Sequence, residues 1–441
     1  MKTETIQNTT NGNTAPTATA TLPDNTDTAP TPKKSKTVTV PELILDGGSS
    51  RTKYYLEKEI GSYQSVCRQF SKTTELPTGY LGVFKIGDNG YAVGDSALSL
   101  SGGNFEEGFA NDNKIKLLNV WIVGALCTHS SFLFKRIKKA GKDKGIIKID
   151  IKLALLSLSS HRKKEIEKAF SNLKFEFNER FFEINIVSYN LYPEGYGAAC
   201  CAKKLIKESG GKDIKFHILD LGGGTLTHTP YSNQNGVPRA SNQNSVSGAG
   251  VVSITEFFAK EASKGDTGGN IYHFSRLKDA LESSTVSESG EYSAEIVLGD
   301  STRDLGDRLK SGLEAWSREI IGVRELLRDV RQILRKGERV FLTGGGFKVE
   351  AVRSFITTYL GSQLVECLPD PDTVNITGLD WLKPPRSSRQ FIISESIAPL
   401  VSEIAAQKGL TDWEMMNRLL EDGLARYSSA LLCRGGSWVN Q

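Results

Sequence analysis

The sequence predicts an α/β protein whose glycine-rich loops follow the ends of apolar strands. Two observations carry this prediction. Apolar runs of strand character alternate with segments of helical periodicity along most of the chain. Three of these runs lead directly into glycine clusters, in the stretches LILDGGSS, HILDLGGGT and VFLTGGG. A glycine turn can direct successive backbone N–H groups at an anion, because it carries no Cβ that blocks the approach.

The part of the chain before the second glycine cluster predicts strands, hairpins and helices in turn. The run TVTVPELILD predicts a strand that ends at Asp46, and KYYLEK predicts a second strand after a turn. Alternating apolar and small residues on either side of GDNG indicate a hairpin. The remaining segments predict helices at 115–129, 131–139, 162–172 and 195–209, a strand at 145–156 and a hairpin at 174–187.

The rest of the chain repeats the arrangement of strand, glycine turn and further element. A strand at 215–219 leads into DLGGGT, and a strand at 339–342 leads into TGGG. The segments between and after them predict helices at 251–264, 275–282 and 349–360, a strand at 293–298 and a long amphipathic helical region at 304–335.

Composition limits the classes of function. The chain has 441 residues, 38% hydrophobic and 24% charged, with a formal net charge of +4. The length suits two or more domains, and the charge indicates no global affinity for nucleic acid or membranes. None of the six cysteines has CxxC spacing, so we expect neither a zinc site nor a disulfide framework. Free cysteines suit a reducing compartment, so we expect a cytoplasmic location. The polar N-terminus and short apolar runs predict no signal peptide and no membrane segment.

Two aspartates and a lysine supply the charges that a phosphate site needs. Asp46 and Asp220 each end a strand and could offer oxygens to Mg²⁺, usually through its waters. Lys53 would place a point charge on a phosphate. The chain contains no GxxxxGK[ST], which excludes a P-loop, and no GxGxxG that opens a βαβ unit, so a Rossmann site has no support. Taken singly, each of these loops is more often a structural turn than a phosphate site, and only their order and wide spacing as a set are specific.

In this order and at this spacing, the loops resemble the nucleotide-binding motifs of the actin-like ATPase superfamily, over residues of about 38–382. The resemblance implies a two-domain fold of duplicated ribonuclease H-like units, Mg²⁺ held near Asp46 and Asp220, and ATP, with GTP as an alternative. It assigns the nucleotide to the following residues: Gly47, Gly48, Ser49, Ser50, Lys53, Gly222, Gly223, Gly224, Thr225, Gly248, Gly250, Gly344, Gly345, Gly346 and Lys348.

The stretch NLYPEGYGAACC resembles the helix that connects the two phosphate loops in that family. By resemblance Glu194 would orient the attacking water, and with Asp46 and Asp220 it forms the expected catalytic set. The alternative interpretation of Glu194 is a carboxylate near the N-terminus of a helix, where its negative charge interacts favourably with the helix dipole. Gly248 and Gly250 also allow a second interpretation: instead of contacting the nucleotide, they could form an ordinary glycine turn that caps a helix. The sequence departs from the family at Thr227, where an acidic residue is usual, and this puts the hydrolysis rate in question.

The resemblance is greatest to the plasmid-segregating bacterial actins of the ParM type. It implies a protein that polymerises with bound ATP, hydrolyses it, and moves DNA or builds a cytoskeleton. It also implies domain I at 37–195 and domain II at 196–382, with a return to domain I near 350–382. The composition of residues 1–36, with few large apolar side chains, predicts a disordered arm, and residues 383–441 form an extension. The alternatives are a non-polymerising small-molecule kinase of the same superfamily and a DNA-binding regulator.

The extension is unusual for an actin. It predicts a strand at 389–394, a helix at 397–408, and a second helix from Thr411 to Tyr427. This order resembles a ribbon-helix-helix module, a fold that pairs strands of two chains in the DNA major groove. Adaptors of segregating actins can carry this fold. The alternative is a helical hairpin that docks on the actin core or on a neighbouring subunit, so direct DNA binding by the tail stays open.

Overall fold

Two mixed β-sheets organise the chain before Gly378. The computed structural model describes residues 38–48, 50–56, 59–72, 74–108, 111–140, 145–158, 162–211, 215–234, 237–264, 272–299, 301–379, 398–408, 410, 415–416 and 418–419. The arm predicted at 1–36 lies outside these residues. The chain divides into two compact units, one ending at Thr377 and one beginning at Gly378.

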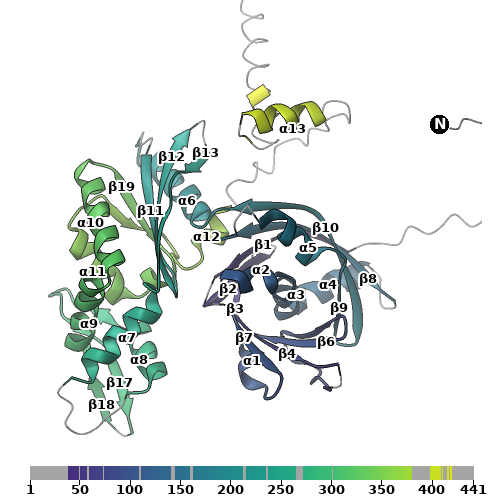
Figure 1. Ribbon diagram of the computed structural model, residues 1–441, viewed down its shortest axis with the longest axis horizontal. Helices are drawn as coiled ribbons and strands as arrows, with labels where there is room; N and C mark the ends of the chain where they lie inside the picture. The colour runs from purple at the N-terminus through teal and green to yellow at the C-terminus, as the bar shows by residue number, and fades with distance from the viewer. Residues whose placement is uncertain are drawn as a thin grey trace, which may run out of the picture. The chain divides into compact units, whose positions relative to one another are not determined.

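The larger sheet contains ten strands in the order β3-β2-β1-β8-β10-β9-β5-β6-β4-β7 (Figure 1). The strand β1 is antiparallel to β2 and parallel to β8, and β8 is parallel to β10. The bounds are β1 Val38–Gly47, β2 Arg51–Leu56, β3 Glu59–Gln64, β4 Val66–Phe70, β5 Val83–Ile86, β6 Asn89–Val93, β7 Asn104–Glu107, β8 Ile147–Leu156, β9 Leu173–Phe177 and β10 Arg180–Tyr192.

The smaller sheet contains six strands in the order β13-β12-β11-β19-β20, with β14 also paired to β12. Here β11 is antiparallel to β12 and parallel to β19, and β19 is parallel to β20. The bounds are β11 Lys215–Leu221, β12 Thr225–Gln234, β13 Val237–Ala240, β14 Asn244–Ser247, β19 Arg339–Thr343 and β20 Val365–Cys367. Two small hairpins pair β15 Thr285–Val286 with β16 Tyr292–Ser293 and β17 Glu295–Leu298 with β18 Ser301–Asp304.

The two sheets share one topology. The order β3-β2-β1-β8-β10 in the larger sheet has the same directions as β13-β12-β11-β19-β20 in the smaller one: an antiparallel meander of three strands, followed by two parallel strands. A sheet of this kind joins a hairpin, which needs only a turn, to parallel strands, which need crossover helices. The structure is therefore built from two halves of equivalent design, as the sequence predicted.

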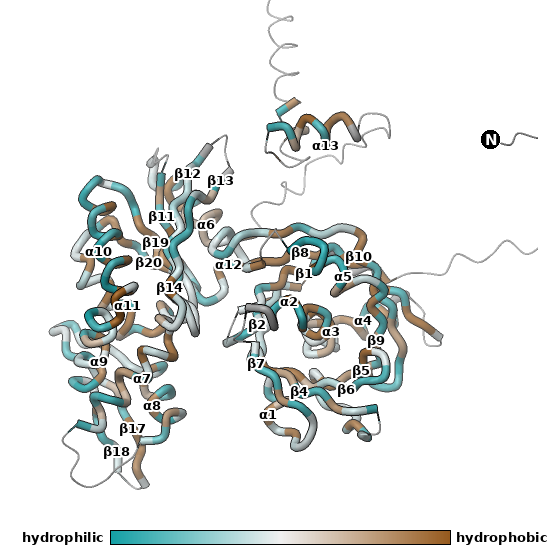
Figure 2. Tube along the Cα trace, in the orientation of Figure 1, coloured by the Kyte–Doolittle hydropathy of each residue, from teal (hydrophilic) through white to brown (hydrophobic). Residues whose placement is uncertain are grey.

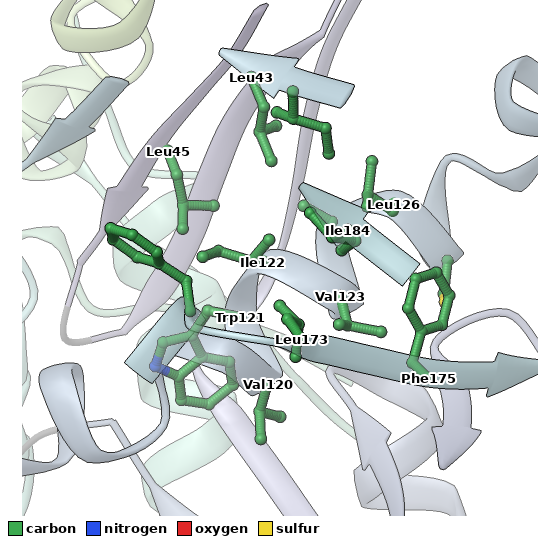
Figure 3. Close-up of a cluster of buried hydrophobic side chains, with 14 of the residues drawn as sticks. Leu43, Leu45, Val120, Trp121, Ile122, Val123, Leu126, Leu173, Phe175 and Ile184 are labelled. Carbon is green, nitrogen blue, oxygen red and sulfur yellow. The ribbon is translucent and has the colours of Figure 1, made fainter. Parts of the chain in front are cut away.

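The larger sheet curves around one largely apolar helix, α3 Leu118–Thr128 (Figure 1). Trp121 and Ile122 of this helix are at most 2% exposed and pack with Leu45 and Phe175 of the strands (Figure 3). Figure 2 accordingly shows α3 largely in the hydrophobic colour. A helix that is apolar on nearly every side has to be buried on nearly every side, which explains the curvature. The other helices of this half are α1 Asp95–Ser99, α2 Asn111–Lys116, α4 Ser130–Ala140 and α5 Lys163–Phe170.

Helices cover both faces of the smaller sheet. One face packs on α7 Val251–Ala262, α9 Gly306–Glu319, α10 Ile321–Arg335 and α11 Glu350–Leu360. The other packs on α6 Tyr196–Glu208 and α12 Val374–Thr377. Adjacent strand residues alternate between these faces, so Leu219 joins the first core and Ile218 the second. The helix α8 Phe274–Glu282 and the short 3₁₀ helix η2 Gly345–Lys348 complete this half.

Most predicted elements are present, with differences at breaks in helices. The helix predicted at 115–129 is divided at Leu117 into α2 and α3, and the helical region at 304–335 is divided at Ile320, whose backbone is extended. The strands β12, β13, β14, β15, β18 and β20 were not predicted, and neither were β3, β4 and β7, whose sequences lack a clear period-two pattern. The hairpins at GDNG and at 174–187 are confirmed as β5-β6 and β9-β10.

The unit after Gly378 is described only in part. Helix α13 spans Ala398–Gln407, within the helix predicted at 397–408. Val401, Ala405 and Met415 form a small buried cluster. The strand predicted at 389–394 and most of the second helix lie outside the described residues, so the ribbon-helix-helix interpretation stays a prediction.

Candidate functional site

Asp46 and Asp220 occupy equivalent places in the two halves. Each lies near the end of the first strand of its meander, in β1 and β11, and each is 7% exposed. Asp46 lies opposite Lys53 on β2, and Asp220 lies opposite Thr227 on β12. Residues directly opposite in an antiparallel pair point to the same face of the sheet. Thr227, which departs from the family pattern, is therefore the counterpart of Lys53 in the other half.

Asp46 is held by a serine in an unusual conformation. The hydroxyl of Ser157 donates to Asp46 Oδ1 over 2.9 Å. Ser157 directly follows β8, the parallel neighbour of β1, and its φ of 62° lies in the left-handed region that non-glycine residues rarely adopt. A strained backbone of this kind persists where surrounding contacts require it. Here it places the Ser157 hydroxyl where it can hold the buried carboxylate of Asp46.

Asp220 is held from two sides. Asn375 of α12 donates through Nδ2 to Asp220 Oδ2 over 3.0 Å. Against the other oxygen lies Gly344, where a Cβ would be 2.2 Å from Asp220 Oδ1. Gly344 has a φ of 95°, so glycine is required there both by conformation and by space. The third glycine cluster therefore closes on the carboxylate of the second.

Glu194 belongs to the same electrostatic cluster. It lies in the turn before α6, and burial, the charge of Asp220 and that of Asp46 raise its pKa to about 7, against the opposing charge of Lys114. Burial also raises the pKa of Asp220, whereas the hydrogen bond from Asn375 and the charge of Lys53 lower it. Three carboxyl groups and two ammonium groups thus share one site, the setting in which pKa values depart from normal.

The second glycine loop packs tightly on two neighbours. The carbonyls of Gly222 and Gly223 accept from the N–H groups of Val251 and Val252, each over 3.0 Å. A Cβ on Gly250 would lie 2.4 Å from the carbonyl of Gly223, so Gly250 has to be small. Gly248 donates to the Gly224 carbonyl over 2.8 Å. The N-terminus of α7 is therefore attached to the back of this loop.

The structure brings most of the predicted site residues together, but not all of them. Contacts or charges link Asp46, Ser50, Lys53, Glu194, Asp220, Gly222, Gly223, Gly224, Gly248, Gly250 and Gly344. Gly346 packs on Leu221, and Lys348 forms an exposed ion pair with Asp372 over 3.1 Å. Gly47 ends β1 and Gly48 follows it, Thr225 begins β12, and Gly345 begins η2. Ser49 lies outside the described residues.

Four residues of the cluster were not predicted from the sequence: Lys114, Ser157, Gln243 and Asn375. Lys114 and Gln243 act on Glu194, by charge and by hydrogen bond. For Ser157 a signal exists, because it follows a strand predicted next to the first phosphate loop. The other three lie in helices or loops that are distant in sequence from the residues they act on, and no local motif marks them.

The donor set fits a nucleotide with a hydrated divalent cation. Within the described ranges, no group of three or more His, Cys, Asp or Glu side chains could hold a metal alone. Mg²⁺ is usually held by one or two carboxylates together with substrate phosphates and waters. Asp46 and Asp220 can supply those carboxylates, and the glycine loops beside them leave space where a Cβ would otherwise project.

Comparison with solved structures defines the fold. No protein-family model and no curated protein sequence matches the chain. Its fold is that of the actin homologues. A 15-stranded ParM filament from Clostridium botulinum matches at a TM-score of 0.52 and 15% identity, over 77% of this chain and 97% of that chain. An archaeal actin homologue matches at 0.53 and 15%, over 77% and 97%. The actin-like protein Alp7A matches at 0.53 and 16%, over 84% and 99%.

These matches confirm the predicted actin-like fold and its resemblance to ParM. At such low identity they define the architecture alone, so the activity has to be argued from the site. Among the helices of the described residues, none has both the length and the apolar character needed to cross a membrane.

Proposed function

We propose that the chain is an ATP-dependent, filament-forming actin homologue that hydrolyses ATP. The observation that carries this proposal is the meeting of the two glycine loops. Gly223 of the second loop lies against Ser50 of the first, so that a Cβ at Gly223 would be 1.5 Å from the Ser50 hydroxyl oxygen. Two loops that follow equivalent strands of two halves can hold one polyphosphate between them.

The charges of the cluster suit phosphoryl transfer to water. Positioning and charge stabilisation account for most of this chemistry. Lys53 and Lys114 would counter phosphate charge, and Asp46 and Asp220 would hold the cation. Mg²⁺, when bound, would neutralise charge on the phosphates. Glu194, with its pKa raised to about 7, would accept a hydrogen bond from the attacking water.

The finer roles rest on the fold. We propose division into a domain I at 37–195 and a domain II at 196–382, with the nucleotide between them, in a cytoplasmic protein. The likeness to a ParM filament supports self-association and, further, DNA segregation through a ribbon-helix-helix adaptor. Those parts of the proposal depend on the nucleotide-dependent polymer and are tested after it.

The test is polymerisation of the purified full chain. With ATP and Mg²⁺ we expect pelletable filaments, seen by electron microscopy, and phosphate release that follows assembly. Omission of nucleotide or chelation of Mg²⁺ should abolish both, and GTP in parallel defines the base preference. Tight ATP binding without any polymer over a range of salt would contradict the filament proposal. Phosphate transferred to an added small molecule, with no ATPase in its absence, would instead identify a kinase.

A further inference from the structure

Asn375 links two parts of the site through one side chain. Its Nδ2 donates to Asp220 Oδ2 over 3.0 Å, and its Oδ1 accepts from the backbone N–H of Ala198 over 3.3 Å. Asn375 is 8% exposed, and its helix α12 also contacts β1 and β2 of the other half. The short helix α12 (Figure 1), near the end of the actin-like unit, thus contacts elements of both halves.

The bond to Ala198 completes the N-terminus of α6. The first turn of a helix leaves backbone N–H groups without partners in the helix. The N-cap residue of α6 is Gly195, which has no side chain to accept a hydrogen bond from the first turn. Asn375, from a distant part of the chain, accepts one instead. Glu194 lies directly before this helix, so the orientation of that end affects where its carboxylate points.

The packing shows that α12 has to lie where it does. A Cβ on Gly197 would be 2.0 Å from the backbone oxygen of Asn375, so the first turn of α6 and α12 are in direct backbone contact. The amide of Asn375 carries both a donor for the carboxylate and an acceptor for the N–H group. Aspartate has the same shape as asparagine but lacks the donor, and leucine lacks both groups.

We propose that Asn375 is a positioning residue of the site: its amide fixes the orientation of Asp220 and connects that carboxylate to the helix that follows Glu194. The catalytic part of this inference rests on the proposed function. Its structural part does not, because it rests on the two hydrogen bonds alone. Hydrogen bonds to metal-binding carboxylates typically change metal affinity or activity by about 10- to 100-fold.

The first test uses the nucleotide-free protein and the variant Asn375→Asp. The new carboxylate would face Asp220 over the same short distance, so the pair should retain one proton at a pH where the parent has lost it. We expect the apparent pKa followed by carbonyl-carbon NMR to rise by about one to three units. The melting temperature should lie furthest below that of the parent at high pH. The difference in melting temperature between variant and parent should become smaller on acidification, because the introduced carboxyl group can donate a hydrogen bond once it is protonated.

Two further variants separate positioning from packing. Asn375→Leu keeps the branched shape but removes both hydrogen bonds without adding a charge, so its loss of stability should grow with pH less steeply than that of Asn375→Asp. Asn185→Asp makes the same chemical change at an exposed position, where Asn185 donates to Asp150 over 2.9 Å, and should leave the pH dependence almost unchanged. An Asn375→Asp variant whose deficit grows with pH no more steeply than that of Asn375→Leu would overturn the inference.

The second test measures ATP hydrolysis at saturating and limiting Mg²⁺. Asn375→Asp and Asn375→Leu should lower kcat/KM by about 10- to 100-fold, and only the aspartate variant should recover partly as the pH falls. Activity equal to the parent in both variants would refute the catalytic part. If the parent itself neither binds nor hydrolyses ATP, the proposed function fails, while the NMR and melting results still decide whether Asn375 controls Asp220.

Discussion

Gly223 lies against Ser50 so closely that a Cβ atom on Gly223 would be 1.5 Å from the Ser50 hydroxyl oxygen and 2.8 Å from its Cβ. The contact joins the second glycine loop to the first. Because Ser50 follows β1 and Gly223 follows β11, it also joins the two equivalent halves of the actin-like unit. A Cβ on the neighbouring Gly224 would meet no atom within 4 Å.

This difference predicts unequal effects of two alanine substitutions. Gly223→Ala should force the loops apart and lower the free energy of unfolding by about 1–3 kcal/mol. Gly224→Ala meets no atom within 4 Å, and its φ is not positive, so it should be neutral or slightly stabilising. Denaturant unfolding of the nucleotide-free protein measures both. Equal losses would mean that the contact between the loops does not contribute to stability.

Glu194→Gln should separate nucleotide binding from hydrolysis. In the parent, kcat/KM should rise with pH through about 7, because the ionised carboxylate is the form that accepts from water. The glutamine variant should be slower by about 10²-fold or more, without that titration, and should bind ATP within a few-fold of the parent. Phosphate release against pH measures this, and an unchanged profile would exclude Glu194 from the reaction.

The same substitution should stabilise the protein above neutral pH. The pKa of Glu194 in the folded state, about 7, exceeds its ordinary value of 4.5, so ionisation disfavours folding and the parent loses stability as the pH rises between those values. At about pH 8 we expect Glu194→Gln to be more stable by about 1–3 kcal/mol, with no difference near about pH 4. Melting temperatures at the two pH values check the sign, and a variant that is less stable at high pH contradicts it.

The buried histidine pair should make the fold sensitive to acid. His217 Nδ1 lies 3.0 Å from His228 Nε2, and His217 Nε2 lies 2.5 Å from Glu338 Oε2. Burial and the neighbouring His217 lower the pKa of His228 to about 4, and burial lowers that of His217. The unfolded chain therefore binds protons first, and stability is lost as the pH falls from about 6.5 towards about 4.

His228→Gln keeps an amide donor for His217 but does not titrate. It should lose about 2–3 kcal/mol less stability than the parent between about pH 7 and about pH 4. Denaturation curves at several pH values measure the difference. If parent and variant lose stability in parallel, His228 is not the group that titrates.

Thr227→Asp would restore the acidic residue that the actin-like family usually has. Thr227 is 1% exposed, lies opposite Asp220, and its Oγ1 is 3.0 Å from Ser245 Oγ. A second buried carboxylate beside Asp220 should cost about 3–5 kcal/mol at neutral pH and less on acidification. Thr227→Asn, which is uncharged, is the matched control and should cost less. A stable aspartate variant would show that this position tolerates the acid as in the family.

Sequence patterns were sufficient for the strands and loops whose roles are local. Asp46 and Asp220 could be predicted because each ends an apolar strand just before glycines, and the hairpin at GDNG because its turn chemistry is local. The strand β7 could not, because Asn104–Glu107 is largely exposed and is a strand only through its pairing with β4.

The order of the glycine loops along the chain determined the fold class and the two principal carboxylates of the site. The tertiary structure alone decided what holds those carboxylates: Ser157 on Asp46, and Asn375 and Gly344 on Asp220. The physical reason is distance along the chain. A hydrogen bond between positions 220 and 375 leaves no trace in the periodicity of either segment, because only the folded sheet and α12 bring the two side chains together.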